Sequence, residues 1–238
     1  MMLIPFITAG FPTKEAFAGI LKELDSNGAD IIEIGVPFSD PVADGPVIEA
    51  ASIQALANGV TLPWIFEELR KLKGQLRAKL VLMGYLNPFL QYGPRAFADT
   101  CAELGIYGVI IPDLPLDESA EMRALLKAKQ VCLISLVAPN TPEERMRAYA
   151  EVSEGYVYVV SVLGVTGARS GFPPEAQETL RRARKVFKIP LALGFGFSHP
   201  DQLKELPELP DGIIFGSALV RHLGEGKSAG EFMRRWKV

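Results

Sequence analysis

Short continuous runs of apolar residues alternate with amphipathic stretches along the whole chain. Because these runs do not alternate in polarity, we interpret them as parallel strands that are buried on both faces. The eight predicted strands are residues 3–8, 30–36, 79–85, 107–112, 131–137, 156–162, 190–194 and 212–215.

Helical patterns separate the predicted strands. Thr13 can cap a helix that stops near Gly28, and Thr141 precedes Pro142 and two glutamates that suit a first helical turn. Strand followed by helix, repeated eight times over 238 residues, predicts a single-domain (β/α)8 TIM barrel spanning residues 1–238. An open doubly wound sheet is the alternative, but residues 9–12 lack the Gly-rich turn typical of it.

One connection in this pattern is unusually long. Between the second and third strands lie two helical patterns, residues 46–58 and 62–74, and an irregular stretch at residues 37–45. An enlarged loop at the carboxyl end of a strand lies on the catalytic face of a TIM barrel.

Composition narrows the class of partner. The net charge of −3 provides no excess of positive charge for binding nucleic acid or an anionic membrane. No apolar run is long enough to span a bilayer and the start has no basic region, so we expect a cytoplasmic protein. We expect Cys101 and Cys132, the two cysteines, to be reduced thiols without a zinc site.

Glycines follow the last three predicted strands. They occur at residues 164–167, at 194–196 and at Gly216, which Ser217 and a short helical pattern follow. Glycine lets backbone N–H groups approach an anion, and a helix N-terminus adds partial positive charge. Tight turns alone would also use glycine, but three consecutive loops favour a phosphate site at the barrel mouth.

Glu33 lies inside the second predicted strand, among isoleucines. An ionised carboxylate there is costly unless it is held or its pKa rises, and a raised pKa suits proton transfer near neutral pH. The alternative is an ion pair with an interior Lys or Arg. We favour an acid–base role at the barrel mouth.

Other polar residues are ambiguous from chemistry alone. Asp40, Asp44 and Asp113 each follow a strand and can either act in a site or cap a turn. His199 and His222 are not clustered with acids or thiols, so we expect both at the surface and expect no metal site.

Residues 33–46, Glu-Ile-Gly-Val-Pro-Phe-Ser-Asp-Pro-Val-Ala-Asp-Gly-Pro, resemble the signature of the tryptophan synthase alpha subunit family. Segments that match this family in type and order are residues 3–12, 82–88, 112–115, 164–167, 194–196 and 216–220. The resemblance covers nearly the whole chain and implies a phosphate-binding TIM barrel.

The resemblance implies a lyase that cleaves indole-3-glycerol phosphate to indole and glyceraldehyde 3-phosphate by a retro-aldol reaction. It makes Glu33 the general acid–base, and Asp44 the group that accepts a hydrogen bond from the indole N–H. It implies no cofactor in this chain and a beta subunit partner that carries pyridoxal phosphate. The partner would dock around residues 37–46 in an α2β2 complex.

The resemblance also assigns supporting residues. Residues 163–173, including Thr166, form the expected lid over the substrate. The residues expected to grip the phosphate are Gly167, Gly196, Gly216 and Ser217. Those expected to bind the rest of the substrate are Phe6, Ile48, Met83, Tyr85, Tyr158, Thr166, Phe195 and Ile214.

Two departures from the family pattern stand out. The chain reaches its first strand at Leu3, so we expect the helix that covers the barrel bottom to be missing or truncated. Glu49 stands where the family often has glutamine, and would raise the pKa of Asp44 if the two approach. Two other functions remain open at this point: a phosphosugar isomerase on the same barrel, and a non-catalytic activator of a partner protein.

Overall fold

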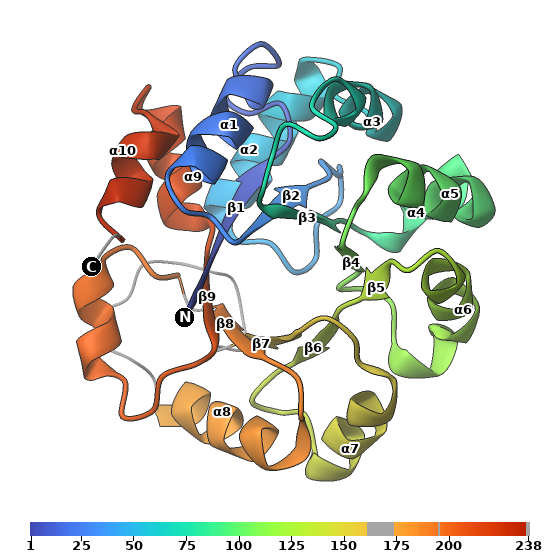
Figure 1. Cartoon of the computed structure of the whole chain (residues 1–238), viewed down its shortest axis with the longest axis vertical. Helices are drawn as coiled ribbons and strands as arrows, with labels where there is room; N and C mark the ends of the chain where they lie inside the picture. The colour runs from blue at the N-terminus through green and yellow to red at the C-terminus, as the bar shows by residue number, and fades with distance from the viewer. Residues whose placement is uncertain (161–173, 195, 237–238) are drawn as a thin grey trace.

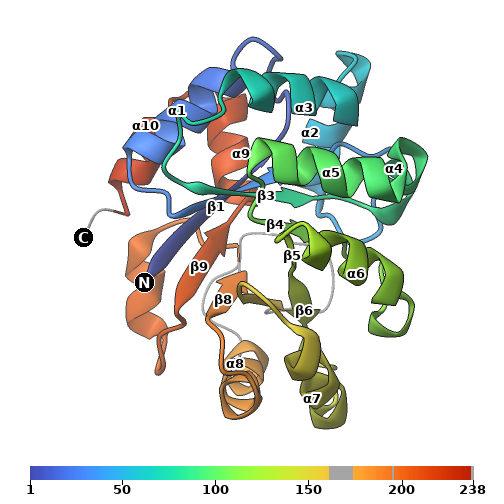
Figure 2. The ribbon, with the colours of Figure 1, turned by 45° about the vertical axis from the view of Figure 1, so that its right-hand side comes forward.

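The computed structural model describes residues 1–160, 174–194 and 196–236, and these form a ring of parallel strands surrounded by helices (Figures 1 and 2). The strand segments are hydrogen-bonded in the order β5-β4-β3-β2-β1-β9-β8-β7-β6. Their bounds are β1 Met2–Thr8, β2 Ile31–Gly35, β3 Lys79–Met83, β4 Gly108–Ile110, β5 Cys132–Leu133, β6 Ser135–Val137, β7 Val157–Val160, β8 Leu191–Gly194 and β9 Gly212–Phe215.

The ring closes where β5 and β6 meet. Only Ile134 separates these two segments, and its N–H donates to the carbonyl of Val109 in β4 at 2.9 Å. On its other side β6 pairs with β7, with Ser135 opposite Val157. Residues 132–137 therefore act as one strand between two neighbours, and the predicted eight-stranded TIM barrel is confirmed.

Helices cover the outside of the ring in the order that alternation predicts. The predicted helices at residues 46–58 and 62–74 are α2 and α3, each shorter by one to three residues at its end. The helices are α1 Phe17–Ser26, α2 Pro46–Ala57, α3 Leu62–Lys71, α4 Leu86–Tyr92, α5 Pro94–Leu104, α6 Ala120–Ala128, α7 Glu143–Val152, α8 Pro174–Val186, α9 Ser217–Gly224 and α10 Ala229–Arg234, with 3-10 turns at Leu116–Glu118 and Pro200–Glu205.

Two apolar layers stabilise the barrel. One lies between the ring and its helices and contains side chains such as Ile7 and Phe17, both fully buried. The other fills the inside of the ring. Its fully or nearly fully buried members are Ile4, Ile31, Val81, Ile110, Ile134, Tyr156, Ala192 and Ile214.

The short helix α4 follows β3 directly, although Pro88 stands inside it. A proline is tolerated in the first helical turn because its missing N–H would have no partner there. The N–H of Leu86, which has no acceptor within the helix, donates to the Asp113 carboxylate at 2.9 Å. Asp113, which the sequence left between catalysis and capping, therefore caps a helix from the neighbouring strand's loop.

Replacing Asp113 with Ala is expected to lower the free energy of unfolding by about 1 kcal/mol, because a helix N–H loses its acceptor. Urea denaturation measures this change. The matched control is Asp117→Ala, which removes an exposed ion pair with Arg145 and should change stability by less than about 0.5 kcal/mol. Equal losses in both variants would contradict the capping role.

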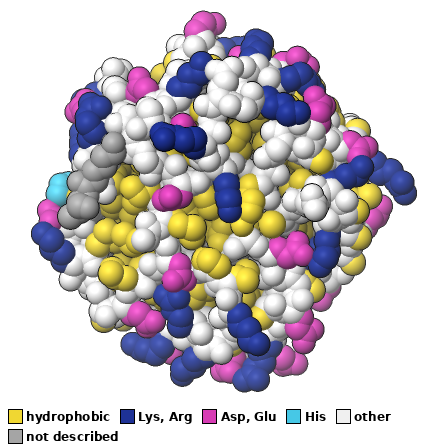
Figure 3. Space-filling model, in the orientation of Figure 1, with side chains coloured by type: hydrophobic (Ala, Val, Ile, Leu, Met, Phe, Trp, Pro, Cys, Tyr) yellow, Lys and Arg dark blue, Asp and Glu magenta, His cyan; other side chains and the backbone are white. Residues whose placement is uncertain are grey.

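At the end of the barrel where the strands begin, hydrophobic side chains gather in the middle of the surface (Figure 3). Strand β1 begins at Met2, and none of the described residues forms a helix before it. Within the described part of the chain, no helix is both long and apolar enough to cross a membrane.

Candidate active site

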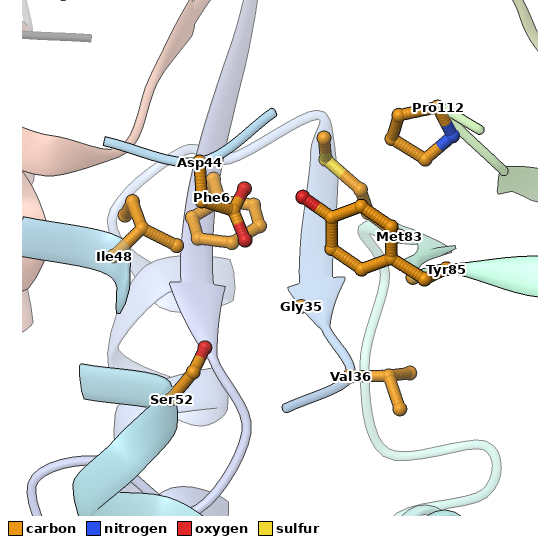
Figure 4. A pocket seen from close by; sticks show the side chains of 10 residues that line it. Phe6, Gly35, Val36, Asp44, Ile48, Ser52, Met83, Tyr85 and Pro112 are labelled. Atoms are coloured by element: carbon orange, nitrogen blue, oxygen red, sulfur yellow. The ribbon is translucent and has the colours of Figure 1, made fainter. Parts of the chain in front are cut away.

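A cleft opens where strands β1, β2 and β3 end, beside the long β2–α2 loop (Figure 4). The empty space in and above it is about 290 Å³, which includes open solvent at its mouth. The carboxyl ends of parallel strands meet at this end of the barrel, which is where a TIM barrel builds its active site. The lining residues are Phe6, Gly35, Val36, Asp44, Ile48, Ser52, Met83, Gly84, Tyr85 and Pro112.

The floor of the cleft is apolar and tightly packed. The ring of Phe6 lies so close to Gly35 that a Cβ at that position would be 2.5 Å from the ring's Cζ atom. Only glycine therefore fits at residue 35 beneath this ring. Ile48 from α2 and Met83 from β3 complete an apolar wall suited to a flat aromatic ligand.

Glu33 is completely buried within β2, one inward-facing position before Gly35. The hydroxyl of Tyr156 donates to its Oε1 atom at 2.6 Å, and Oε2 has no hydrogen-bond partner among the described residues. Burial raises the pKa of Glu33 to about 8, although the hydrogen bond from Tyr156 opposes this rise. No described Lys or Arg pairs with Glu33, so its partner is a tyrosine.

Asp44 lies at the end of the β2–α2 loop, and its carboxylate points into the cleft (Figure 4). It does not cap α2, because the capping position is Gly45 and no side chain bonds there. Burial raises the pKa of Asp44, a hydrogen bond from Tyr85 lowers it, and the nearby charge of Glu49 raises it further. The expected influence of Glu49 on Asp44 is therefore present.

Comparison with known proteins identifies the family to which this barrel belongs. The family model for the tryptophan synthase alpha chain matches residues 1–236. The chain belongs to the tryptophan synthase alpha chain family. The fold and the lyase class expected from residues 33–46 are thereby confirmed.

Individual relatives agree with this assignment. The tryptophan synthase alpha chain of Nitratidesulfovibrio vulgaris strain Hildenborough is 63% identical over 234 residues, 98% of this chain and 91% of the relative. That of Desulfovibrio desulfuricans is 60% identical over 99% of this chain and 93% of the relative.

Solved structures give the same family. A chain from the Pyrococcus furiosus study of mutual activation of the tryptophan synthase a2b2 complex superposes with a TM-score of 0.90 at 37% identity, covering 98% of this chain and 94% of that one. A chain of Mycobacterium tuberculosis tryptophan synthase superposes with a TM-score of 0.89 at 37% identity, covering 98% and 89%.

The residues that the alpha chain resemblance assigns to the substrate fall into three groups. Phe6, Ile48, Met83 and Tyr85 line the cleft together with Asp44. Ile214 and Tyr158 lie deeper, in or against the layer that fills the ring. Thr166 and Phe195, with the expected lid at residues 163–173, lie outside the described residues.

Of the phosphate residues, Gly216 and Ser217 stand where β9 passes into α9, with Ser217 as the first helical residue. Gly196 has a φ of 62°, a conformation that favours glycine. Gly167 lies outside the described residues. The backbone of Gly216 passes close to Phe6, since a Cβ there would be 3.1 Å from the ring.

Tyr156 is the residue that sequence reasoning missed. It is the first residue of the predicted strand at residues 156–162, and alternation places it on the same face as Tyr158. Since Tyr158 was expected to face the site, the same period of two could have identified Tyr156.

The prediction that both histidines lie at the surface is wrong for one of them. His199 is exposed and caps the 3-10 turn at Pro200–Glu205. His222 is buried under the ring of Phe232 from α10, and its Nε2 atom lies 3.0 Å from the carbonyl oxygen of Ser228. Asp40 stays outside the cleft and accepts a hydrogen bond from Ser39.

Proposed function

We propose that this chain cleaves indole-3-glycerol phosphate to indole and glyceraldehyde 3-phosphate, with Glu33 as the proton carrier and Asp44 as the partner of the ring N–H. The observation that carries this proposal is the environment of Glu33. Its carboxyl group is completely buried, has a pKa of about 8 and lies one inward-facing position below an apolar cleft that holds Asp44. A carboxyl group with this pKa can both donate and accept a proton near neutral pH.

Both proton transfers follow from this arrangement. Protonated Glu33 delivers its proton to indole C3, and the positive charge that forms on the ring is stabilised by the Asp44 carboxylate through the N–H group. Glu33, now ionised, takes the proton of the side-chain hydroxyl. The carbon–carbon bond breaks, its electron pair returns to the ring, and the hydroxyl-bearing carbon becomes the aldehyde.

Glu33 must change its orientation to act in this way. Its carboxyl group is held by Tyr156 inside the ring and does not line the cleft. Rotation of the side chain away from Tyr156 brings the carboxyl group toward the floor formed by Phe6 and Gly35. The unpartnered Oε2 atom leaves a single hydrogen bond to break on this path.

We further infer that the β2–α2 loop, residues 37–46, docks on a tryptophan synthase beta subunit in an α2β2 complex, and that the reaction runs in the cytoplasm. Val42 in this loop is 82% exposed, so its apolar side chain is available for contact with a partner. The related Pyrococcus furiosus chain comes from a study of mutual activation of the tryptophan synthase a2b2 complex. Docking here would touch the loop that carries Asp44.

The decisive experiment supplies indole-3-glycerol phosphate to the purified chain, with and without a beta subunit. Release of glyceraldehyde 3-phosphate is followed through its oxidation by an NAD-dependent dehydrogenase. We expect release in both cases and faster release with the partner. If no aldehyde phosphate is released under either condition, the proposed function is wrong.

A further inference from the structure

The β2–α2 loop is irregular, yet it must hold Asp44 at a fixed angle to the cleft. Between Pro37 and Asp44, within the described residues, Tyr85 supplies the one side chain from another element that hydrogen-bonds to this loop. The backbone N–H of Ala43 donates to the Tyr85 hydroxyl at 2.9 Å. The loop is therefore fastened to β3 and α4 next to its catalytic end.

The Tyr85 hydroxyl is also directed at the Asp44 carboxylate (Figure 4). Since the oxygen already accepts from Ala43, its own proton is free to donate to Asp44. The pKa of Tyr85 is raised to about 12, chiefly by burial, so the hydroxyl keeps this proton at neutral pH. One hydroxyl thus links a fixed backbone group to a reactive carboxylate.

The ring of Tyr85 is buried and packed against a second aromatic ring. It is 4% exposed, and the ring of Phe38 stacks on it with centroids 5.1 Å apart. Its backbone immediately precedes Leu86, whose N–H is held by Asp113 from the neighbouring strand's loop. A buried side chain held at its backbone and at its hydroxyl has little freedom to turn, which is the requirement for aiming another group.

We propose that Tyr85 is a positioning residue, whose hydroxyl aims the Asp44 carboxylate at the N–H group of the substrate's ring. This inference rests on the proposed function and deepens it. It assigns the hydroxyl of Tyr85 a task distinct from forming the wall of the cleft. The hydroxyl acts through Asp44 and does not touch the reacting atoms.

The test replaces Tyr85 with Phe, which removes one oxygen and keeps the ring. The matched control is Tyr92→Phe at the end of α4, the helix that Tyr85 precedes; among the described residues the Tyr92 hydroxyl bonds to Thr100, at 3.2 Å. We expect kcat/KM to fall about tenfold to a hundredfold in Tyr85→Phe, as for loss of a hydrogen bond to a charged group, and to stay near the wild-type value in Tyr92→Phe.

Two ligands separate positioning from a general loss of structure. The probes are an indol-3-yl alkyl phosphate and its benzofuran analogue, which has oxygen in place of the ring N–H. Wild type and Tyr92→Phe should prefer the indole, whereas Tyr85→Phe should lose most of this preference and bind the benzofuran normally. The acid limb of the pH profile should also move to higher pH, because losing the hydrogen bond raises the pKa of Asp44.

Hydrogen exchange on the wild-type protein tests the bond between Ala43 and Tyr85 directly, without a substitution that could alter the fold. The amide of Ala43 should be protected although it lies in a loop. An unprotected amide, an unchanged indole preference in Tyr85→Phe, or an equal loss in Tyr92→Phe would each overturn the inference. An inactive wild type would instead overturn the proposed function, so the two failures are distinguishable.

Discussion

Replacing Glu33 with Gln is expected to lower kcat for indole-3-glycerol phosphate by about a thousandfold or more, while the KM changes little. Gln has nearly the shape of Glu but cannot exchange a proton, and positioned acid–base groups contribute about 10²–10⁴-fold to rate. Steady-state release of glyceraldehyde 3-phosphate measures this loss. Glu121→Gln, on the exposed start of α6, is the matched control and should turn over normally.

The same variant is expected to be more stable than wild type at alkaline pH. Unfolded Glu33 releases its proton near pH 4.5 and folded Glu33 near pH 8, so the folded protein loses stability as the pH rises through this window. Gln carries no charge in either state. The advantage of the variant should therefore be absent below pH 4.5 and reach several kcal/mol above pH 8.

Urea denaturation at pH 4 and pH 9 measures this advantage. A variant that loses activity while gaining stability at pH 9 separates catalysis from folding. Normal turnover by Glu33→Gln, or equal stability of variant and wild type at pH 9, would contradict the role or the environment assigned to Glu33.

Replacing Asp44 with Asn is the second change with a large expected effect, a loss of about 10²–10³-fold in kcat/KM. The carboxylate stabilises positive charge that develops on the indole ring, and removing one such preorganised group costs this much in other enzymes. The acid limb of the wild-type pH profile should disappear, because burial raises the pKa of Asp44 and protonation of this group produces that limb.

Glu49→Gln is the control for this prediction, and it is expected to widen the pH range of activity instead of lowering kcat/KM. The charge of Glu49 raises the pKa of Asp44, so its removal should extend activity to lower pH with kcat nearly unchanged. The pH dependence of kcat/KM, measured for both Asp44→Asn and Glu49→Gln, tests these two expectations. An acid limb that survives in Asp44→Asn would assign that limb to another group.

The order of strands and helices could be predicted because a strand buried on both faces needs a continuous apolar run. Closure of the ring could be inferred only from the count of eight strands, because no apolar run shows which strands pair. The closed ring joins the two ends of the chain, where Met2 of β1 lies opposite Gly212 of β9. Helix α4 was also not predicted, because a proline such as Pro88 usually interrupts a helix unless it stands in the first turn.

The chemistry of the site was only partly visible in the sequence. A carboxylate among isoleucines pointed to Glu33 as a candidate acid–base group, because burying an ionised carboxylate without a partner is costly. Its tyrosine partner could not be found by spacing, because Tyr156 lies 123 residues away. His222 was misplaced because the sequence does not show that α10 packs over α9.

The junction at Ile134 has a consequence for the behaviour of the whole chain. With residues 132–137 counted as one strand, every described strand of the ring has a neighbour on each side, which leaves little unpaired strand edge in the described part of the chain for another molecule to pair with. Longer unpaired edges exist before residues 132–137 join β4 to β7. The chain is therefore expected to be most prone to aggregate while it is being synthesised or refolded, and a substitution that delays this pairing should reduce the yield of soluble protein more than it reduces the stability of the finished barrel.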